Sequence, residues 1–239
     1  MNIDAKNHGY TELNKTIRES SEEKFELDNE LGQRYIGAGL SGKEILIHGT
    51  PGNALGAYLN GSKIIVHGNA QDAIGDTMND GAIIVHGNCG DTTGYAMRSG
   101  EIYVKGNAGY RVGIHMKSYQ ELYPTIVIGG KVGDFLGEYQ AGGIIIVLGI
   151  GVEGTPVGSF CGTGMHGGEM FIRSENAPKG LPKQVCCNEA TDEEKQTIRK
   201  YIERFTKHFG GNTDELLSVK FYKLTPNSAS PYKQLYVNN

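Results

Sequence analysis

The chain of 239 residues contains no tryptophan, only four cysteines and no long apolar run. The cysteines, Cys89, Cys161, Cys186 and Cys187, show no C-x-x-C spacing of the kind that binds zinc or an iron–sulfur cluster, so they are interpreted as free thiols. A membrane helix needs about 20 apolar residues, and none is encoded. The polar residues 1–10 are also unlike a signal peptide, and a cytoplasmic location is expected.

Excess basic charge is also lacking, because 23 Lys and Arg stand against 27 Asp and Glu, a formal net charge of −4. The charge therefore offers no reason to expect nucleic acid or a membrane surface as a partner. With 38% apolar and 21% charged residues the composition is that of a folded globular protein. Glycine is the residue in excess, at 36 positions without a collagen-like triplet, and this bias prompts a search for repeats.

A repeat of 19 residues runs through the middle of the chain, and each copy contains a short phrase of aliphatic residues. A five-residue insertion around 117–124 interrupts the period once. The phrases are Ile45–Gly49, Ile64–Gly68, Ile83–Gly87, Ile102–Gly106, Ile126–Gly130, Ile145–Gly149 and Met170–Ser174. Two glycines in each copy are expected to form structural turns. They are Gly37, Gly49, Gly56, Gly68, Gly75, Gly87, Gly94, Gly106, Gly113, Gly130, Gly137 and Gly149.

Nineteen residues with a clear strand, a shorter strand and glycine turns are too few for a β-α-β unit, which needs about 30. They suit one coil of a solenoid. The prediction is an all-β fold, a right-handed parallel β-helix of about seven coils, with short α-helical caps at both termini. Three parts are expected: an N-terminal helix and strand cap over 1–30, the β-helix over 31–176, and a C-terminal helix and extended tail over 177–239.

Both ends carry signals for these caps. Leu13 and Ile17 lie at helical spacing within 11–22, and Phe25 and Leu27 alternate as in a short strand. Thr191 and Glu194 have the spacing of a capping box, and a helix with one apolar face then runs to 210–211. The residues beyond it, from 217 to 221 and from 232 to 236, are expected to be extended.

Alternation along each strand predicts which side chains face inward. The second and fourth residues before each coil glycine are aliphatic or Met and form the expected core. A row of mostly methionine side chains on the second strand, with Leu59 and Met78 among them, is interpreted as core packing rather than a metal or haem site. Asn69, Asn88 and Asn107 follow successive coil glycines and are expected to form a hydrogen-bonded ladder at a corner.

Two outward rows point to a partner interface. One is an apolar stripe, which terminal segments or another protein must cover. Its members are Leu46, Ile65, Ile84, Tyr103, Val127, Ile146 and Phe171. The other row begins with His48, His67 and His86. Three stacked histidines suggest a metal, but without a carboxylate or cysteine in the row they are interpreted as an exposed polar row, and no metal site is predicted.

Several phrases resemble the G-x-G-x-G domain at the C-terminus of the large chain of glutamate synthase. The resemblance covers about residues 32–173, and the C-terminal helix and tail look like the stand-alone form of that domain. The most specific phrases are Gly32–Gly37, Gly109–Lys117, Gly133–Tyr139, Val147–Gly149 and Gly162–Gly168.

The resemblance implies a non-catalytic structural subunit that joins a glutaminase part to an FMN- and iron–sulfur-containing synthase part, with those cofactors on partner chains and none on this one. No catalytic, cofactor-binding or metal residue is expected, and no activity of the chain alone. The residues agree, because glutaminases of this class need an N-terminal cysteine nucleophile, whereas this chain has Asn2 followed by Ile3.

Other functions stay open from the sequence. The chain also resembles the corresponding parts of N-methylglutamate synthase and, more distantly, of formylmethanofuran dehydrogenase, in which the similar repeat belongs to the C-type component. An independent enzyme acting on polysaccharide would need clustered carboxylates, and the nearest candidates are Asp134 and Glu138 beside Arg111, His115 and Lys117. A homo-oligomer that buries the stripe against a second copy is a further alternative.

Overall fold

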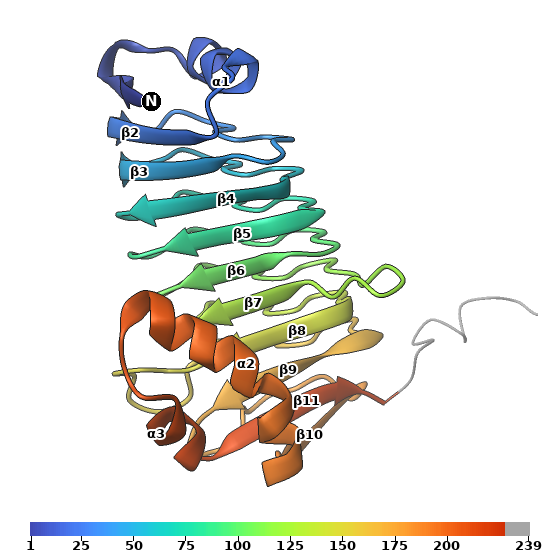
Figure 1. Cartoon of the computed structure of the whole chain (residues 1–239). Coiled ribbons are helices and arrows are strands. Elements are labelled where there is room, and N and C mark those ends of the chain that lie inside the picture. Colours follow the sequence, from blue (N-terminus) through green and yellow to red (C-terminus); the bar gives the residue numbers. More distant parts are fainter. Residues whose placement is uncertain (228–239) are drawn as a thin grey trace, which may run out of the picture.

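The computed structural model describes residues 1–227, which form a tall stack of strands with helices at its upper end and along its lower side (Figure 1). Its elements in chain order are β1 (Asn2–Asp4), the 3-10 helix η1 (Ala5–Asn7), α1 (Tyr10–Glu19), β2 (Lys24–Leu31), β3 (Glu44–Thr50), β4 (Asn60–His67), β5 (Asp80–Val85), β6 (Glu101–Val104), β7 (Thr125–Ile128), β8 (Ala141–Val147), β9 (Gly167–Arg173), β10 (Val185–Glu189), α2 (Asp192–Phe209), α3 (Thr213–Ser218) and β11 (Phe221–Pro226).

Within residues 1–227 the strands form one sheet of 11, in the order β1-β2-β3-β4-β5-β6-β7-β8-β9-β11-β10. Neighbours from β1 to β9 are parallel, whereas β11 pairs antiparallel with both β9 and β10. Ile45 pairs with Ile64, and Ile64 with Ile83, so the 19-residue spacing is the register between neighbouring strands. Residues one repeat apart therefore lie side by side.

The prediction of a right-handed parallel β-helix of about seven coils is wrong. The structure is a single mixed sheet, mostly parallel, to which each described repeat contributes one strand. The second strand expected in each coil is replaced by turns, because left-handed backbone recurs there, as at Ala54, Gly56 and Tyr58. A chain that returns to left-handed φ at every second residue cannot stay extended, so these segments form no second sheet.

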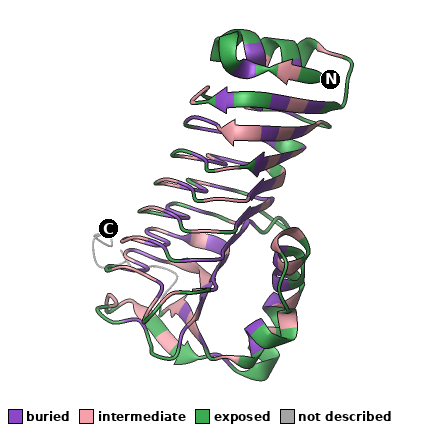
Figure 2. Cartoon of the chain, turned by 90° about the vertical axis from the view of Figure 1, so that its left-hand side faces the viewer, coloured by how far each residue is buried: buried purple, intermediate pink, exposed green. Residues whose placement is uncertain are grey.

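The main core lies between the inner face of the sheet and these returning turns (Figure 2). Ile47 and Val66 from the strands and Met78 and Met97 from the turns are fully buried, as expected of core packing. At Gly75, φ is +66° and a Cβ would lie 2.5 Å from Cδ1 of Ile102 on the strand of a later repeat. Glycine is required there by both backbone and space.

Asparagine side chains tie the corners of successive repeats together. Oδ1 of Asn69 accepts the N–H of Asn88 at 2.8 Å, and Oδ1 of Asn88 accepts the N–H of Asn107 at 2.7 Å, which confirms the predicted ladder. Asp72 and Asp91 form a second ladder of the same kind, since Oδ1 of Asp72 accepts the N–H of Asp91 at 2.9 Å. These bonds satisfy corner N–H groups that no strand pairing reaches.

The ends of the stack differ in part from their predictions. Residues 10–19 are helical and 24–31 extended, close to the expected bounds. The tail predicted to be extended begins with a helix, α3, while β11 then joins the sheet. The predicted extended segment at 232–236 lies outside the described residues. Within the described part of the chain, no helix is long and apolar enough to span a membrane.

Candidate interaction face

The outward face of the sheet carries two rows of side chains that run across the strands. The first is the apolar stripe, whose seven members occupy paired positions on β3 to β9. The second lies two residues further along each strand, on the same face, and begins with His48 and His67, which are paired on β3 and β4. The alternation in sequence therefore places both rows together on one surface.

The chain itself covers the C-terminal part of the stripe, where α2 lies across the lower strands (Figure 1). Five members of the stripe form one buried cluster with α2 and β11. The stripe members are Ile84, Tyr103, Val127, Ile146 and Phe171, and they pack with Ile198, Tyr201, Ile202 and Phe205 of α2 and with Phe221 of β11. Each of these five stripe residues is at most 1% exposed. This segment of the stripe is therefore not available to a partner while α2 stays docked.

Three local features favour the docking of α2 onto the sheet. The helix starts with the predicted capping box, in which the Thr191 hydroxyl accepts the N–H of Glu194 and the Glu194 carboxylate accepts the N–H of Thr191. Arg204 forms an ion pair with Glu101 on β6. Gly129 takes the place of a histidine in the second row, and a Cβ there would lie 2.8 Å from Cζ of Phe205. A larger residue would hold the helix away from the sheet.

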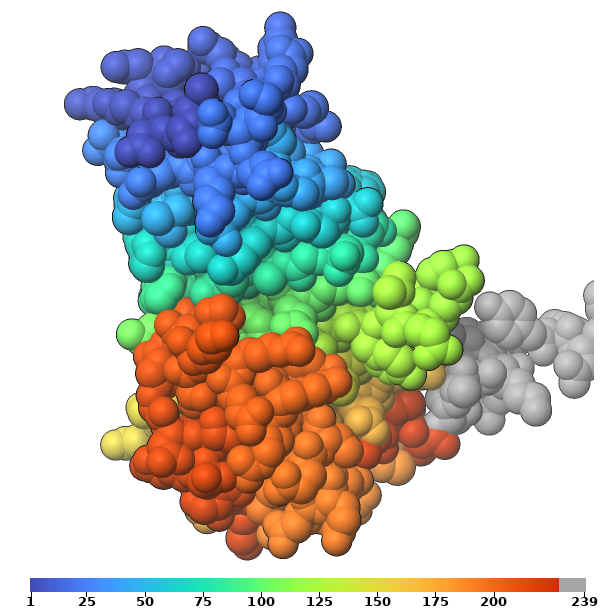
Figure 3. All heavy atoms as spheres, viewed as in Figure 1, coloured from blue at the N-terminus to red at the C-terminus, as the bar shows by residue number. Residues whose placement is uncertain are grey.

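The N-terminal part of the two rows stays uncovered. The space-filling view shows the N-terminal strands lying above α2 (Figure 3). Leu46 and Ile65 are partly exposed, although Ile65 also packs against the edge of the α2 cluster. Together with the three histidines they form the open face, defined as Leu46, Ile65, His48, His67 and His86. Within the described residues, these five members of the predicted interface keep some exposure, although Ile65 and His86 also contact the edge of the α2 cluster or α2 itself.

The three histidine rings lie next to one another along the sheet, His48 stacked on His67 and His86 tilted against His67. Ring centroids lie 5.4 Å apart for His48 and His67 and 4.4 Å apart for His67 and His86, and Phe209 at the end of α2 meets His86 edge-on at 5.1 Å. Partial burial, together with the nearby charges of His67 and Lys105, lowers the pKa of His86 below its usual value. The row therefore ends in a neutral imidazole against α2 at neutral pH.

The rows continue past the repeat in a way that the sequence pattern does not reveal. Glu26 on β2 pairs with Leu46, and Asp28 follows two residues later on the same face, next to His48. The register between β2 and β3 is 20 residues up to the pairing of Leu27 with Ile47 and returns to 19 only at Glu30, so a search at period 19 does not align Glu26 and Asp28 with the rows. The alternation of Phe25 and Leu27 is the available signal, because it places Glu26 and Asp28 outward.

A cleft of about 520 Å³ opens beside the end of α2. Phe205 and Phe209 line it from the helix, Lys105 and Asn107 from the turn after β6, and Glu215 from α3. Since Phe209 also touches His86, the cleft adjoins the open face. Sequence reasoning missed it because it forms only once α2 and α3 have folded back onto the sheet.

The carboxylates considered for polysaccharide chemistry are engaged in structural contacts. Oδ1 of Asp134 accepts the N–H of Ser159 at 2.7 Å, and Glu138 forms an ion pair with Arg111 at 2.9 Å. The His115 ring stacks on Tyr139 at 5.1 Å. The two carboxylates therefore cap a turn and bridge neighbouring repeats, which are the roles such residues commonly take in stacked repeats.

The chain is similar to known proteins both in sequence and in fold. A model of the family described as GXGXG motif matches residues 10–228. An uncharacterised protein of Methanocaldococcus jannaschii is 45% identical over 248 residues, which cover 98% of this chain and 95% of that protein. A chain from the crystal structure of the formyltransferase/hydrolase complex of Methylorubrum extorquens, determined with methylofuran, is similar in fold, with a TM-score of 0.65. It is 22% identical, and the match covers 85% of this chain and 73% of that one.

Proposed function

Because the chain belongs to the GXGXG motif family, we propose that it is a non-catalytic structural subunit of a multi-chain enzyme complex. The observation that carries the proposal is the open face. It combines apolar side chains with neighbouring imidazoles on the outward side of the sheet, and the chain covers the equivalent positions of later repeats with its own helix. An apolar surface of this kind is stabilised when a partner covers it. The similar solved chain comes from a multi-chain complex, which supports the proposal.

The specific complex that we propose is of the glutamate-synthase type. In it the chain joins a glutaminase subunit to a synthase subunit that carries FMN and iron–sulfur clusters, and keeps the two sites in fixed relation for ammonia transfer. The phrases shared with the glutamate synthase domain support this choice. The cysteines are consistent with cofactors on partner chains, because burial raises the pKa of both Cys89 and Cys161 to about 12 and keeps these thiols protonated.

Purification of the tagged full-length chain from its native host tests the proposal, with mass spectrometry to identify the chains recovered with it. A glutaminase-like chain and an FMN-binding chain are expected in fixed ratio to the tagged chain. Leu46→Asp and Ile65→Asp, on the open face, should each reduce their recovery. Leu31→Asp is the matched control, because Leu31 is 82% exposed and lies outside the stripe. Recovery of neither enzyme chain, or equal loss with the control, would contradict the proposal.

A second candidate is a role like that of the C-type component of a formylmethanofuran dehydrogenase, and the fold similarity to a chain of the formyltransferase/hydrolase complex favours it. The same purification separates the two. A formyltransferase or a molybdenum- or tungsten-containing chain would identify this second complex. An N-methylglutamate synthase would instead return glutaminase-like and synthase-like chains, and the acceptor used by the purified complex would then distinguish it from glutamate synthase.

The isolated chain can also be examined for self-association. If the open face pairs with a second copy, light scattering should show a dimer that Ile65→Asp returns to a monomer. A dimer that is unchanged in this variant would show that another surface holds it together.

A further inference from the structure

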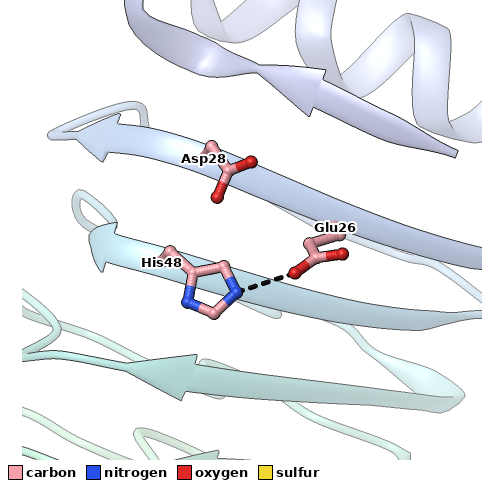
Figure 4. Close-up of side chains that lie close together, drawn as sticks. All are labelled: Glu26, Asp28 and His48. Carbon is pink, nitrogen blue, oxygen red and sulfur yellow. Dashed lines mark hydrogen bonds and ion pairs between the residues drawn. The ribbon is translucent and has the colours of Figure 1, made fainter.

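A group of metal-ligating side chains lies at the N-terminal edge of the open face (Figure 4). Glu26 and Asp28 project from β2 and His48 projects from β3, all from the outward side of the sheet. Oε1 of Glu26 lies 2.9 Å from Nε2 of His48, and one donor atom from each of the three residues lies within 4.8 Å of the other two. Two carboxylates and an imidazole thus converge on one point.

The backbone holds these side chains in place. Leu27, between the two carboxylates, is fully buried, and it pairs with the fully buried Ile47 next to His48. Because the core fixes both inward residues, the outward residues beside them have little freedom except in their side-chain torsions. The His48 ring also stacks on His67 at an interplanar angle of 12°, which restricts its rotation. Folding therefore already restricts much of the conformational freedom that these three residues would otherwise lose on binding a metal ion.

The charges in this group are unbalanced. No Lys or Arg in the described part of the chain forms an ion pair with Glu26 or Asp28, and among the described residues His48 is the only ion-pair partner of Glu26. A third carboxylate, that of Asp4, lies nearby, because Asp4 on β1 is the register partner of Asp28 on β2. By contrast Glu44, a few residues before His48, has Lys63 at 3.4 Å. A cation bound between Glu26 and Asp28 would attract both carboxylates, with which no Lys or Arg side chain of the described residues pairs.

We propose that Glu26, Asp28 and His48 bind one first-row divalent metal ion, with zinc the best match to the donor set. One imidazole and two carboxylates supply three ligands of the types that zinc accepts, and exposure of the group leaves a fourth position for water or for a ligand from a partner. Donors bound tetrahedrally at about 2.0–2.2 Å lie about 3.3–3.6 Å apart. The Glu26 and His48 donors, at 2.9 Å, would therefore open slightly, and the group as a whole, now within 4.8 Å, would close. Side chains that are 40% exposed, as those of Glu26 and His48 are, can make this adjustment.

The site revises an expectation from the sequence. The histidine row by itself contains no carboxylate and gives no reason to expect a metal, yet β2 places two carboxylates beside its first member. The metal site does not depend on the complex to which the chain belongs. Failure of the purification experiment would therefore not contradict the metal site, and absence of metal binding would not contradict the proposed subunit role.

Isothermal titration of Zn²⁺ into the untagged full-length chain, after dialysis against EDTA, tests the proposal. We expect one ion per chain, and a visible absorption band of bound Co²⁺ that Zn²⁺ abolishes. Glu26→Gln and Asp28→Asn should each weaken Zn²⁺ binding by at least about tenfold. Glu23→Gln, which removes the same charge from an exposed residue just before β2, should change binding less than about twofold, on the order of the screened charge effect alone.

Unchanged thermal unfolding of Asp28→Asn would show that its lost binding reflects a lost ligand rather than a lost fold, since Asp28 is exposed. Absence of Zn²⁺ binding to the wild-type chain would overturn the proposal. Binding that survives both carboxylate variants but disappears in His67→Ala or His86→Ala would also overturn it, because the ion would then belong to the imidazole row.

Discussion

Replacing Phe205 with alanine should release α2 from the sheet without unfolding the whole chain. Phe205 is 2% exposed, lies over Gly129 and packs against Phe209 at 4.8 Å between ring centroids. Loss of about 100 Å² of buried apolar area corresponds to about 2.5 kcal/mol, and loss of the aromatic pair adds about 0.5–1.5 kcal/mol. The docking of α2 should therefore weaken by about 3–4 kcal/mol, within the range usual for buried Phe→Ala changes.

Hydrogen exchange followed by mass spectrometry locates this loss. Amides of α2, and those of β6 and β7 beneath it, should exchange faster, while amides of β3 keep their protection, because no residue of β3 belongs to the α2 cluster or packs against it. Phe160→Ala is the matched control, since Phe160 is 53% exposed and its ring stacks only on Phe135 among the described aromatic residues. The reasoning is refuted if both variants lose equal stability, or if protection in β3 falls as far as in α2.

Three further changes follow from local geometry, each measured by chemical denaturation. Gly75→Ala should destabilise the chain by about 2–4 kcal/mol, because it combines left-handed backbone with overlap on Ile102, whereas Gly39→Ala, with similar φ but open space, should cost about 1 kcal/mol. Burial raises the pKa of Glu30 to about 7, above its ordinary 4.5, so the folded state loses stability as the pH rises between these values, where the unfolded chain ionises and the buried carboxyl does not. Glu30→Gln should match the wild type at about pH 4 and exceed it by roughly 2–3 kcal/mol at about pH 8; equal stability at both would contradict this. Thr191→Ala removes the capping box of α2 and should cost about 1 kcal/mol, and no loss would show that α2 is held by packing alone.

The candidate site is predictable in its positions but not in its accessibility. Alternation along each strand identifies the members of the stripe, and period 19 places them side by side. Which members are covered depends on α2, whose apolar residues such as Ile202 and Phe205 come far later in the chain than Ile84. The sequence shows that α2 has an apolar face, but many surfaces could bury it equally well. Only the three-dimensional packing selects the later repeats and leaves Leu46 and Ile65 open.

The metal-ligating group escapes sequence analysis for a different reason. A strand pairing outside the repeat has its own register, and the 20-residue offset between β2 and β3 differs from the 19-residue period of the pattern. Proximity of Asp28 to His48 is therefore a property of how these two strands align, which is decided by burial of Leu27 against the core. Neither residue alone is a signal for metal binding.

The sequence by itself determined the repeat strands β3 to β9, their register and their inward and outward faces, because these depend on local alternation and on a period that recurs along the chain. It also determined the start of α2, since a capping box is a short-range interaction. The tertiary structure decided that each repeat contributes only one strand to a single sheet, because left-handed turns such as that at Tyr58 interrupt the second strand. It also decided that β11 makes this sheet mixed by pairing antiparallel with β9 and β10. It also decided which outward residues are covered and which carboxylates meet His48, because these depend on contacts between segments with no shared pattern.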